Sequence, residues 1–410
     1  MQVLVFTAGF ALLVSCIQFS YRLHIGALGK SGLLIGASDV GLLAGAVVLV
    51  ILALRQEAAI KRLVPGWAVL TVIGAAIVCF VAGPSAAGVK ELIQTIEILW
   101  VGYVLFSIAV RDGKGEELLS ALFLAAALAT AAVAIYQRLV KGTSFFEAGG
   151  LLENRNYLSA YLLLAVPWAA GKYLAPQAKA RLAESIAAGL LVAASFFLAA
   201  NIVVSFALFI GAAIAMAGHD VKGLAGSLTQ KLSLGALAIV WIAATATSQG
   251  TWDGLAIYRQ DVGGTMKPSA RARRWQADMC AVSENPVFGL GLGKYQTEIG
   301  VYYRGAAIKP DGKTNDAAGF DLRADEPGTQ GIWEVIPVEG GLVLTAAWMI
   351  MLTAGAVSAF RNERPGVTGA LVAVLIAGTV VSVWMRGIGV ALAFLLALAA
   401  EKPKSGQPPQ

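Results

Sequence analysis

The residues best suited to chemistry lie in one polar stretch, approximately residues 250–337. Within it, Arg271 and Trp275 are four residues apart, so on a helix they would share one face. A guanidinium held over an aromatic ring is a favourable arrangement, and its planar fork of N–H donors fits phosphate oxygens. The spacing therefore indicates a basic helix that binds phosphate groups, either those of a ligand or those of anionic lipids on which the helix lies. The stretch holds 10 of the 31 Lys and Arg residues: Arg259, Lys267, Arg271, Arg273, Arg274, Lys294, Arg304, Lys309, Lys313 and Arg323.

A turn must follow this helix. The sequence continues Glu284-Asn-Pro-Val-Phe-Gly-Leu-Gly-Leu-Gly-Lys-Tyr295, in which proline and repeated glycine predict that the helix ends. Gly289, Gly291 and Gly293 permit positive φ and a close approach of backbone. The motif is not a dinucleotide-binding fingerprint, because no strand precedes it and the glycine spacing differs.

Histidine and cysteine contribute little to the expected chemistry. The two histidines, His24 and His219, lie outside the polar stretch, which excludes most histidine-based catalysis there. The three cysteines, Cys16, Cys79 and Cys280, are far apart, and no disulfide framework or metal-ligand spacing follows from them. We expect neither a cofactor nor a metal site.

The elements that position these residues are membrane helices. The chain has 410 residues, 58% of them hydrophobic and 14% charged, with a mean hydropathy of +0.72. Soluble domains carry about 25% charged residues, and apolar blocks of about 20 residues are typical of transmembrane helices. We predict an all-α, polytopic integral membrane protein with about 12 transmembrane helices. The expected spans are approximately 3–20, 32–54, 66–83, 93–110, 118–137, 156–174, 184–200, 202–218, 232–249, 338–358, 367–385 and 388–400.

These spans divide the chain into four parts. We expect an N-terminal transmembrane bundle of about nine helices (1–249), one large extracytoplasmic loop between spans nine and ten (250–337), C-terminal transmembrane helices (338–400) and a disordered cytoplasmic tail (401–410). No Lys or Arg precedes the first apolar run, so residues 3–20 are predicted to be a retained helix rather than a signal peptide.

The distribution of basic residues predicts the orientation. One set of alternate short loops carries about twice as many Lys and Arg residues as the other, which predicts that both termini are cytoplasmic. The net charge of +6 therefore reflects the orientation of the helices in the membrane. We expect a lipid bilayer rather than nucleic acid as the partner of these charges.

Two acidic residues, Asp39 and Glu97, lie inside apolar spans. Such groups are costly in lipid and usually face the interior of a helix bundle or a wet cavity. The predicted topology puts both in the outer part of their helices. They line either an outward-facing polar cavity beneath the long loop or simply reach interfacial water. Arg386, between the last two spans, is expected on the same side.

Three motifs together resemble the O-antigen ligase/polymerase family, whose members are polytopic GT-C-type membrane glycosyltransferases. The first is Arg271-x3-Trp275 followed by the Asn-Pro-x-Phe-Gly-x-Gly-x-Gly-x-Tyr run. The second, in residues 149–162, contains Asn154-x-Asn156 before a helix. The third is Val338-Glu-Gly-Gly341. Their order and spacing agree with the family over about residues 90–360, and the first motif is the most specific.

The resemblance implies a metal-independent enzyme in the bacterial inner membrane. It would transfer or polymerise a glycan from an undecaprenyl-diphosphate carrier at the outer face, as in the assembly of lipopolysaccharide and other surface polysaccharides. The acceptor would be the lipid A core, a second carrier-linked glycan, or a protein in related members. Arg271 matches the motif arginine and is expected to stabilise the charge that develops on the leaving diphosphate. Residues expected to contribute to substrate binding are Arg273, Arg274, Trp275, Asn156, Gln330, Arg386, Asp39 and Glu97.

The sequence also departs from the family. Gln330 stands where a histidine is commonly taken as the base that activates the acceptor, and residues 199–203 lack the arginine of a Ser-Arg-Gly motif. Three explanations remain open. A carboxylate replaces the histidine, with Glu326, Glu334 and Glu339 as the candidates. A polymerase-like member relies mainly on arginines. Or the protein is a divergent relative, such as a membrane transporter of a polar or anionic solute. An acid near the start of a helix is also favoured by the helix dipole alone.

Overall fold

The protein is described by a computed structural model. The residues that it describes are 2–17, 20–23, 33–54, 64–141, 148–152, 154–175, 178, 180–199, 201–218, 228–247, 259–262, 265–268, 270–302, 307–308, 314–315, 331–381 and 386–402.

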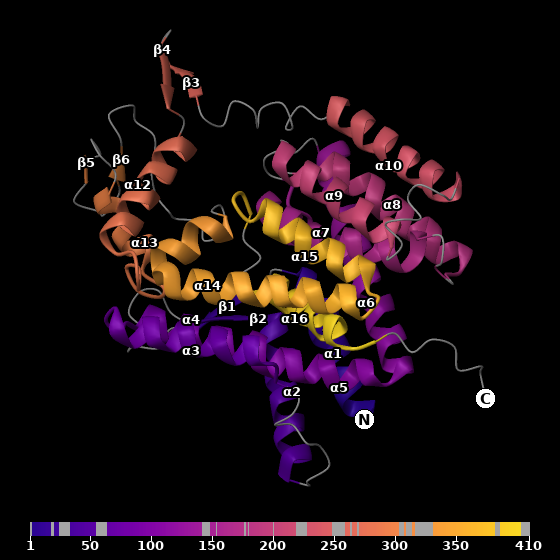
Figure 1. Cartoon of the computed structure of the whole chain (residues 1–410), viewed down its shortest axis with the longest axis horizontal. Helices are drawn as coiled ribbons and strands as arrows, with labels where there is room; N and C mark the ends of the chain where they lie inside the picture. Colours follow the sequence, from indigo (N-terminus) through magenta and orange to yellow (C-terminus); the bar gives the residue numbers. More distant parts are fainter. Residues whose placement is uncertain are drawn as a thin grey trace.

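The described chain is mainly helical (Figure 1). Its α-helices are α1 (Gln2–Leu13), α2 (Ala37–Leu54), α3 (Gly66–Val81), α4 (Ala86–Ile96), α5 (Tyr103–Arg111), α6 (Gly113–Leu139), α7 (Arg155–Ala169), α8 (Leu182–Leu198), α9 (Ile202–Ala217), α10 (Leu228–Thr247), α12 (Ala270–Glu284), α13 (Tyr295–Glu298), α14 (Ile332–Arg361), α15 (Pro365–Ala377) and α16 (Arg386–Ala400). Shorter helical pieces are η1 (Val14–Cys16), η4 (Glu97–Gly102), η5 (Gly150–Leu152), η6 (Ala170–Leu174) and η9 (Ile299–Tyr302), of which η4 and η6 are π-helical.

Several of these helices are suited to a membrane. Three segments in the described part are long and apolar enough to cross one, namely Ala86–Arg111, Gly113–Leu139 and Ile332–Arg361. Eight shorter apolar helices of 10–17 residues accompany them. Each of the predicted spans coincides with a helix, because apolar blocks bounded by polar turns are a strong helix signal. The number of helices that actually cross a membrane stays a prediction.

Some predicted helix ends were wrong. The first helical segment ends at Cys16 rather than at residue 20, and Ser20–Leu23 (β1) pairs antiparallel with Leu33–Gly36 (β2), which begins where the second span was expected to be helical. Two further hairpins, β3–β4 (Arg259–Val262 with Thr265–Pro268) and β5–β6 (Ala307–Ile308 with Thr314–Asn315), lie in the long polar segment. Strands of two to four residues are too short to leave a periodic pattern, so the all-α prediction missed them.

The centre of the bundle is the short helix α16. Its residues from Val390 to Ala399 are all at most 1% exposed, and α1, α5, α7 and α14 pack around it. Elsewhere glycines allow helices to approach closely. A Cβ on Gly369 in α15 would lie 2.2 Å from the carbonyl oxygen of Gly211 in α9. Small residues at such crossings are typical of helix packing in membranes, where van der Waals contact replaces the hydrophobic effect.

Ion pairs join turns that the prediction places on one side of the membrane. Glu116 at the start of α6 accepts hydrogen bonds from both terminal guanidinium nitrogens of Arg364, between α14 and α15, and lies 3.8 Å from the ammonium of Lys172. Arg111 bonds Glu401 at 2.8 Å. Arg111, Glu116 and Arg364 belong to loops predicted to be cytoplasmic, Lys172 lies at the cytoplasmic end of the span predicted for residues 156–174, and Glu401 begins the predicted cytoplasmic tail. This agreement fits the predicted alternation of loops, whereas the identity of the cytoplasmic side stays a prediction.

Candidate functional site

The long polar segment contains the expected basic helix. Helix α12 runs from Ala270 to Glu284 and ends where Asn285 and Pro286 follow. Gly289, Gly291 and Gly293 have φ values of 62°, 110° and 72°, in the left-handed region that glycine permits. The helix, the glycine turn and α13 lie beside the N-terminal part of α14, at one end of the molecule (Figure 1).

Helix α14 is broken at Gly341, whose φ of 55° and ψ of −151° are not helical. The glycine turn fills this break with four backbone hydrogen bonds, which we call the backbone clamp. Its bonds are Leu342 N to Pro286 O (2.8 Å), Val343 N to Val287 O (3.2 Å), Leu290 N to Val338 O (2.7 Å) and Gly291 N to Glu339 O (2.9 Å). A broken helix exposes unpaired N–H groups on one side of the break and unpaired carbonyls on the other. The clamp satisfies groups of both kinds.

Glycine is required at two positions of the clamp. A Cβ on Gly289 would lie 2.4 Å from the carbonyl oxygen of Val338, and one on Gly341 would lie 2.5 Å from that of Val287. No side chain fits at these distances, and both residues have positive φ. The glycines that carry the family resemblance therefore join α12 to α14.

Tyr295 connects three parts of this unit. Its backbone N–H donates to Glu339 Oε1 at 3.0 Å, and its hydroxyl donates to Asp278 Oδ1 at 2.8 Å. Only 2% of the tyrosine is exposed. Glu339, one of the carboxylates expected from the sequence, thus holds the start of α13 against α14, while Asp278 ties α13 to α12.

Asp278 is the ionisable residue of the site that sequence reasoning missed. It is fully buried, and burial is the main cause that raises the pKa of its carboxyl from 3.8 to about 7. The Tyr295 hydrogen bond and the charge of Arg274 lower this pKa, whereas the negative charge of Glu334 raises it. Its Oδ2 atom makes no hydrogen bond to any residue in the described part of the chain. A carboxyl with a pKa near neutrality and one free oxygen is suited to accept a proton.

Glu334 has a structural role. Its Oε2 accepts a hydrogen bond from Gly331 N at 3.1 Å, which caps the start of α14, and 4% of the residue is exposed. The same turn is tied to the end of α15, because Trp333 N donates to Gly378 O at 3.0 Å and the Trp333 indole donates to Leu375 O at 3.1 Å. The polar segment is therefore fixed where it enters α14.

The structure brings Arg274, Glu334 and Glu339 together with Asp278 and Tyr295 in one cluster, which we call the α12–α14 cluster. Trp275, one residue from Arg274, is 47% exposed on the outer side of α12. Five other members of the predicted site lie partly or wholly outside the described residues. Arg271 and Arg273 lie on α12 and Arg386 begins α16, with side chains outside the described part, and Glu326 and Gln330 fall outside the described residues altogether.

The other predicted residues lie on different elements. Asp39 is buried in the first turn of α2, and Glu97 begins the π-helical turn η4 between α4 and α5. Asn156 is the second residue of α7, where its backbone N–H donates to the Asn154 side chain at 2.8 Å. Their proposed role in substrate binding stays a prediction.

An arginine does reach the junction of α8 and α9, although none is present there in the sequence. Arg155, from the start of α7, is buried and donates to the carbonyl of Ala199 at 3.2 Å. Arg138, at the end of α6, donates to the carbonyl of Phe197 at 3.0 Å and lies 4.0 Å from the centre of its ring. Sequence reasoning singled out Asn156 and overlooked its neighbour, because the partner of Arg155 is 44 residues away.

Comparisons with known proteins give no identification, because the sequence matches no protein-family model and no curated protein.

Proposed function

We propose that this protein is a membrane glycosyltransferase of surface polysaccharide assembly, and that it uses an undecaprenyl-diphosphate-linked glycan as donor. The observation that supports this most directly is the α12–α14 cluster. The residues that carry the family resemblance come from two separate parts of the sequence, and the backbone clamp joins them into one unit. That unit contains an arginine and a carboxyl with a pKa near neutrality.

In the proposed reaction, a hydroxyl group of the acceptor attacks the anomeric carbon of the donor sugar. The bond between that carbon and the diphosphate oxygen breaks, and the bonding electrons leave with undecaprenyl diphosphate. Arginines of α12, Arg271 and Arg274, stabilise the negative charge that grows on the leaving group. The proton of the attacking hydroxyl passes to a carboxylate, for which Asp278 is our candidate. Because Asp278 is buried, the proposal requires α12 to shift from α14 when the substrates bind.

The test is the surface polysaccharide of cells that carry Arg271→Lys or Arg271→Ala. We expect both variants to lose high-mass polysaccharide on gels at normal expression, because an ammonium does not reproduce the planar, bidentate contact of a guanidinium with phosphate. Arg361→Ala, at the exposed end of α14, is the matched control and should be normal. Normal polysaccharide from both Arg271 variants would overturn the arginine part of the proposal.

A second candidate is a transporter of a polar or anionic solute. The break in α14, together with the buried Asp39, favours it, because transporters often bind solutes at discontinuous helices. Against it, the backbone clamp already satisfies groups on both sides of the break. Solute flux into vesicles that contain the purified protein, in the absence of any glycan donor, would favour the transporter.

A further inference from the structure

Helix α12 has two unlike faces. Ala277, Asp278 and Ala281 are at most 1% exposed and pack toward α14. On another side, Trp275 and Met279 are 47% and 43% exposed. They are four residues apart, so they form one apolar stripe along the helix. Large apolar side chains exposed together on a helix outside the membrane spans usually mark a contact surface.

The stripe continues toward α14. Val287, in the turn after α12, is 47% exposed, and its carbonyl accepts the hydrogen bond from Val343 N at the break in α14. The residue before Val343 is Leu342, which is 66% exposed. Exposed apolar side chains therefore lie on α12, in the turn after it and on α14, which is long and apolar enough to cross a membrane.

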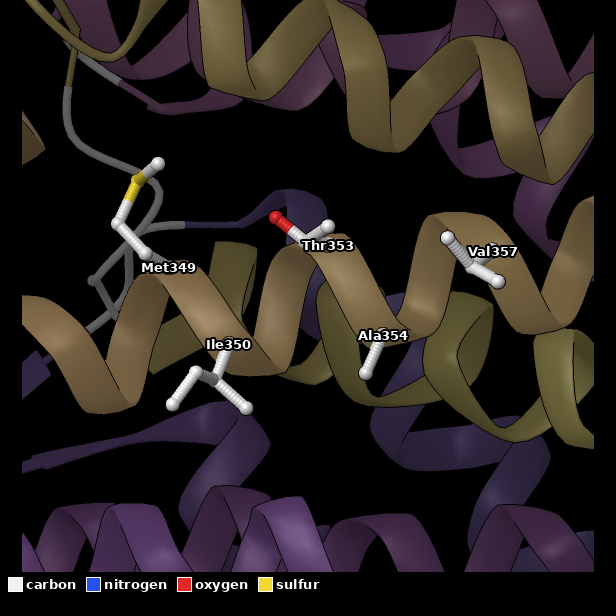
Figure 2. A pocket seen from close by; sticks show the side chains of 5 residues that line it. All are labelled: Met349, Ile350, Thr353, Ala354 and Val357. Atoms are coloured by element: carbon white, nitrogen blue, oxygen red, sulfur yellow. The ribbon is translucent and has the colours of Figure 1, made fainter.

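Farther along α14 the exposed surface remains apolar. Met349 and Ile350 are 43% and 47% exposed. They line a shallow pocket in which Thr353 provides the only polar side chain among five (Figure 2). Such a surface on a membrane-length helix is suited to contact lipid acyl chains. The stripe on α12 therefore adjoins a surface of this kind.

The charges of α12 complement an anionic surface. Its N-terminal half contains Arg271, Arg273 and Arg274, whereas its acids are the buried Asp278 and the terminal Glu284. The N-terminal end of a helix carries a partial positive charge, so three arginines there are not favoured by the helix itself. The charge of Arg274 acts in part on Asp278 within the protein. A helix end with three arginines also complements the negative charge of lipid phosphates at a membrane surface.

We propose that α12 lies in the outer membrane interface, on a surface of anionic phospholipid. Trp275, Met279 and Val287 occupy the boundary between headgroups and acyl chains, and the basic N-terminal half of the helix lies at the level of the lipid phosphates. Basic helices with one aromatic and apolar face adopt this position. The inference does not depend on the proposed glycosyltransferase activity.

The experiment places single nitroxide labels on the full-length protein in nanodiscs of phosphatidylethanolamine and phosphatidylglycerol. The partly exposed Cys280 is first replaced in Cys280→Ser, whereas Cys16 and Cys79 are buried and stay. Labels are then introduced singly through Met279→Cys and Val287→Cys. Ile350→Cys on α14 is the lipid reference, and Thr297→Cys, exposed on α13, is the aqueous reference. Each label is tested with oxygen, which concentrates in lipid, and with a water-soluble nickel complex.

We expect the labels at 279 and 287 to relax mainly through oxygen, as at 350, and the label at 297 to relax mainly through nickel. In nanodiscs of phosphatidylcholine alone, the balance at 279 should shift toward nickel, because the anionic partner of the arginines is missing. Nickel-dominated relaxation at 279 and 287 in the anionic discs would overturn the proposal. Protection from both reagents would also overturn it, because that result indicates a covering protein surface. An unchanged balance at 279 in phosphatidylcholine would refute the role of lipid charge.

Discussion

Replacement of Asp278 by asparagine should stabilise the protein above neutral pH and abolish its activity. The unfolded carboxyl ionises near its usual value of 3.8, whereas the folded one keeps its proton up to a pKa of about 7. Between these values the unfolded chain has lost a proton that the folded protein retains, so the stability of the wild type falls as the pH rises. A shift of about 3 pKa units at ~1.4 kcal/mol each gives a loss of about 4 kcal/mol, complete above pH 7.

Asp278→Asn removes this penalty and keeps an oxygen for the Tyr295 hydroxyl. We expect the unfolding temperature of the purified variant to exceed that of the wild type at pH 8 and to change less between pH 5 and pH 8. Glu284→Gln, at the exposed end of α12, is the matched control and should follow the wild type. If Asp278→Asn is less stable than the wild type at pH 8, the carboxylate stabilises the fold by pairing with Arg274. The reasoning from burial is then refuted.

Three further variants test the packing and the ion pairs of the fold. Gly341→Ala should lower the unfolding temperature. A backbone with φ 55° and ψ −151° is open essentially only to glycine and costs another residue about 1–3 kcal/mol, and the new Cβ would lie 2.5 Å from the Val287 carbonyl oxygen. Gly189→Ala in α8 is the control, because a Cβ at this position meets no other atom within 4 Å, and it should raise the free energy of unfolding by ~0.5–1 kcal/mol. Equal effects of the two substitutions would contradict the requirement for glycine in the backbone clamp. Glu116→Gln should lower the free energy of unfolding by roughly 3–5 kcal/mol, because it leaves Arg364 and Lys172 without their largely buried carboxylate. An unfolding temperature equal to that of the wild type would show that these ion pairs do not stabilise the fold.

Much of the helical fold could be predicted from the sequence, because an apolar block between polar turns specifies an apolar helix without reference to the rest of the chain. The end of α12 at Glu284, before Asn285 and Pro286, and the tolerance of the three glycines for positive φ are local properties of the same kind. The break in α14 could not be predicted in this way. Gly340 and Gly341 are compatible with a continuous helix in the sequence, and the break depends on hydrogen bonds from the distant turn at residues 286–291.

The candidate site was less predictable for a related reason. A charged residue in a polar segment is expected to be solvated, so the sequence gives no reason to expect that Asp278 is buried. It is buried because Ala277 and Ala281, next to it on α12, pack against α14 and bring the carboxyl with them to Tyr295. Conversely, Glu334 and Glu339 were predicted as catalytic carboxylates, and both accept backbone hydrogen bonds at the start of an element. Whether either also acts in catalysis stays a prediction.

The central claim is that the protein transfers a glycan, and reconstitution tests it most directly. Purified protein in liposomes would be given an undecaprenyl-diphosphate-linked glycan together with either the lipid A core or a second carrier-linked glycan as acceptor. We predict that the acceptor gains the donor glycan and that one undecaprenyl diphosphate is released for each transfer, and that Arg271→Ala abolishes both products. A known transferase in the same liposomes serves as the control that the donor is reactive. If that enzyme consumes the donor and this protein transfers no glycan to either acceptor, the proposed glycosyltransferase activity is contradicted.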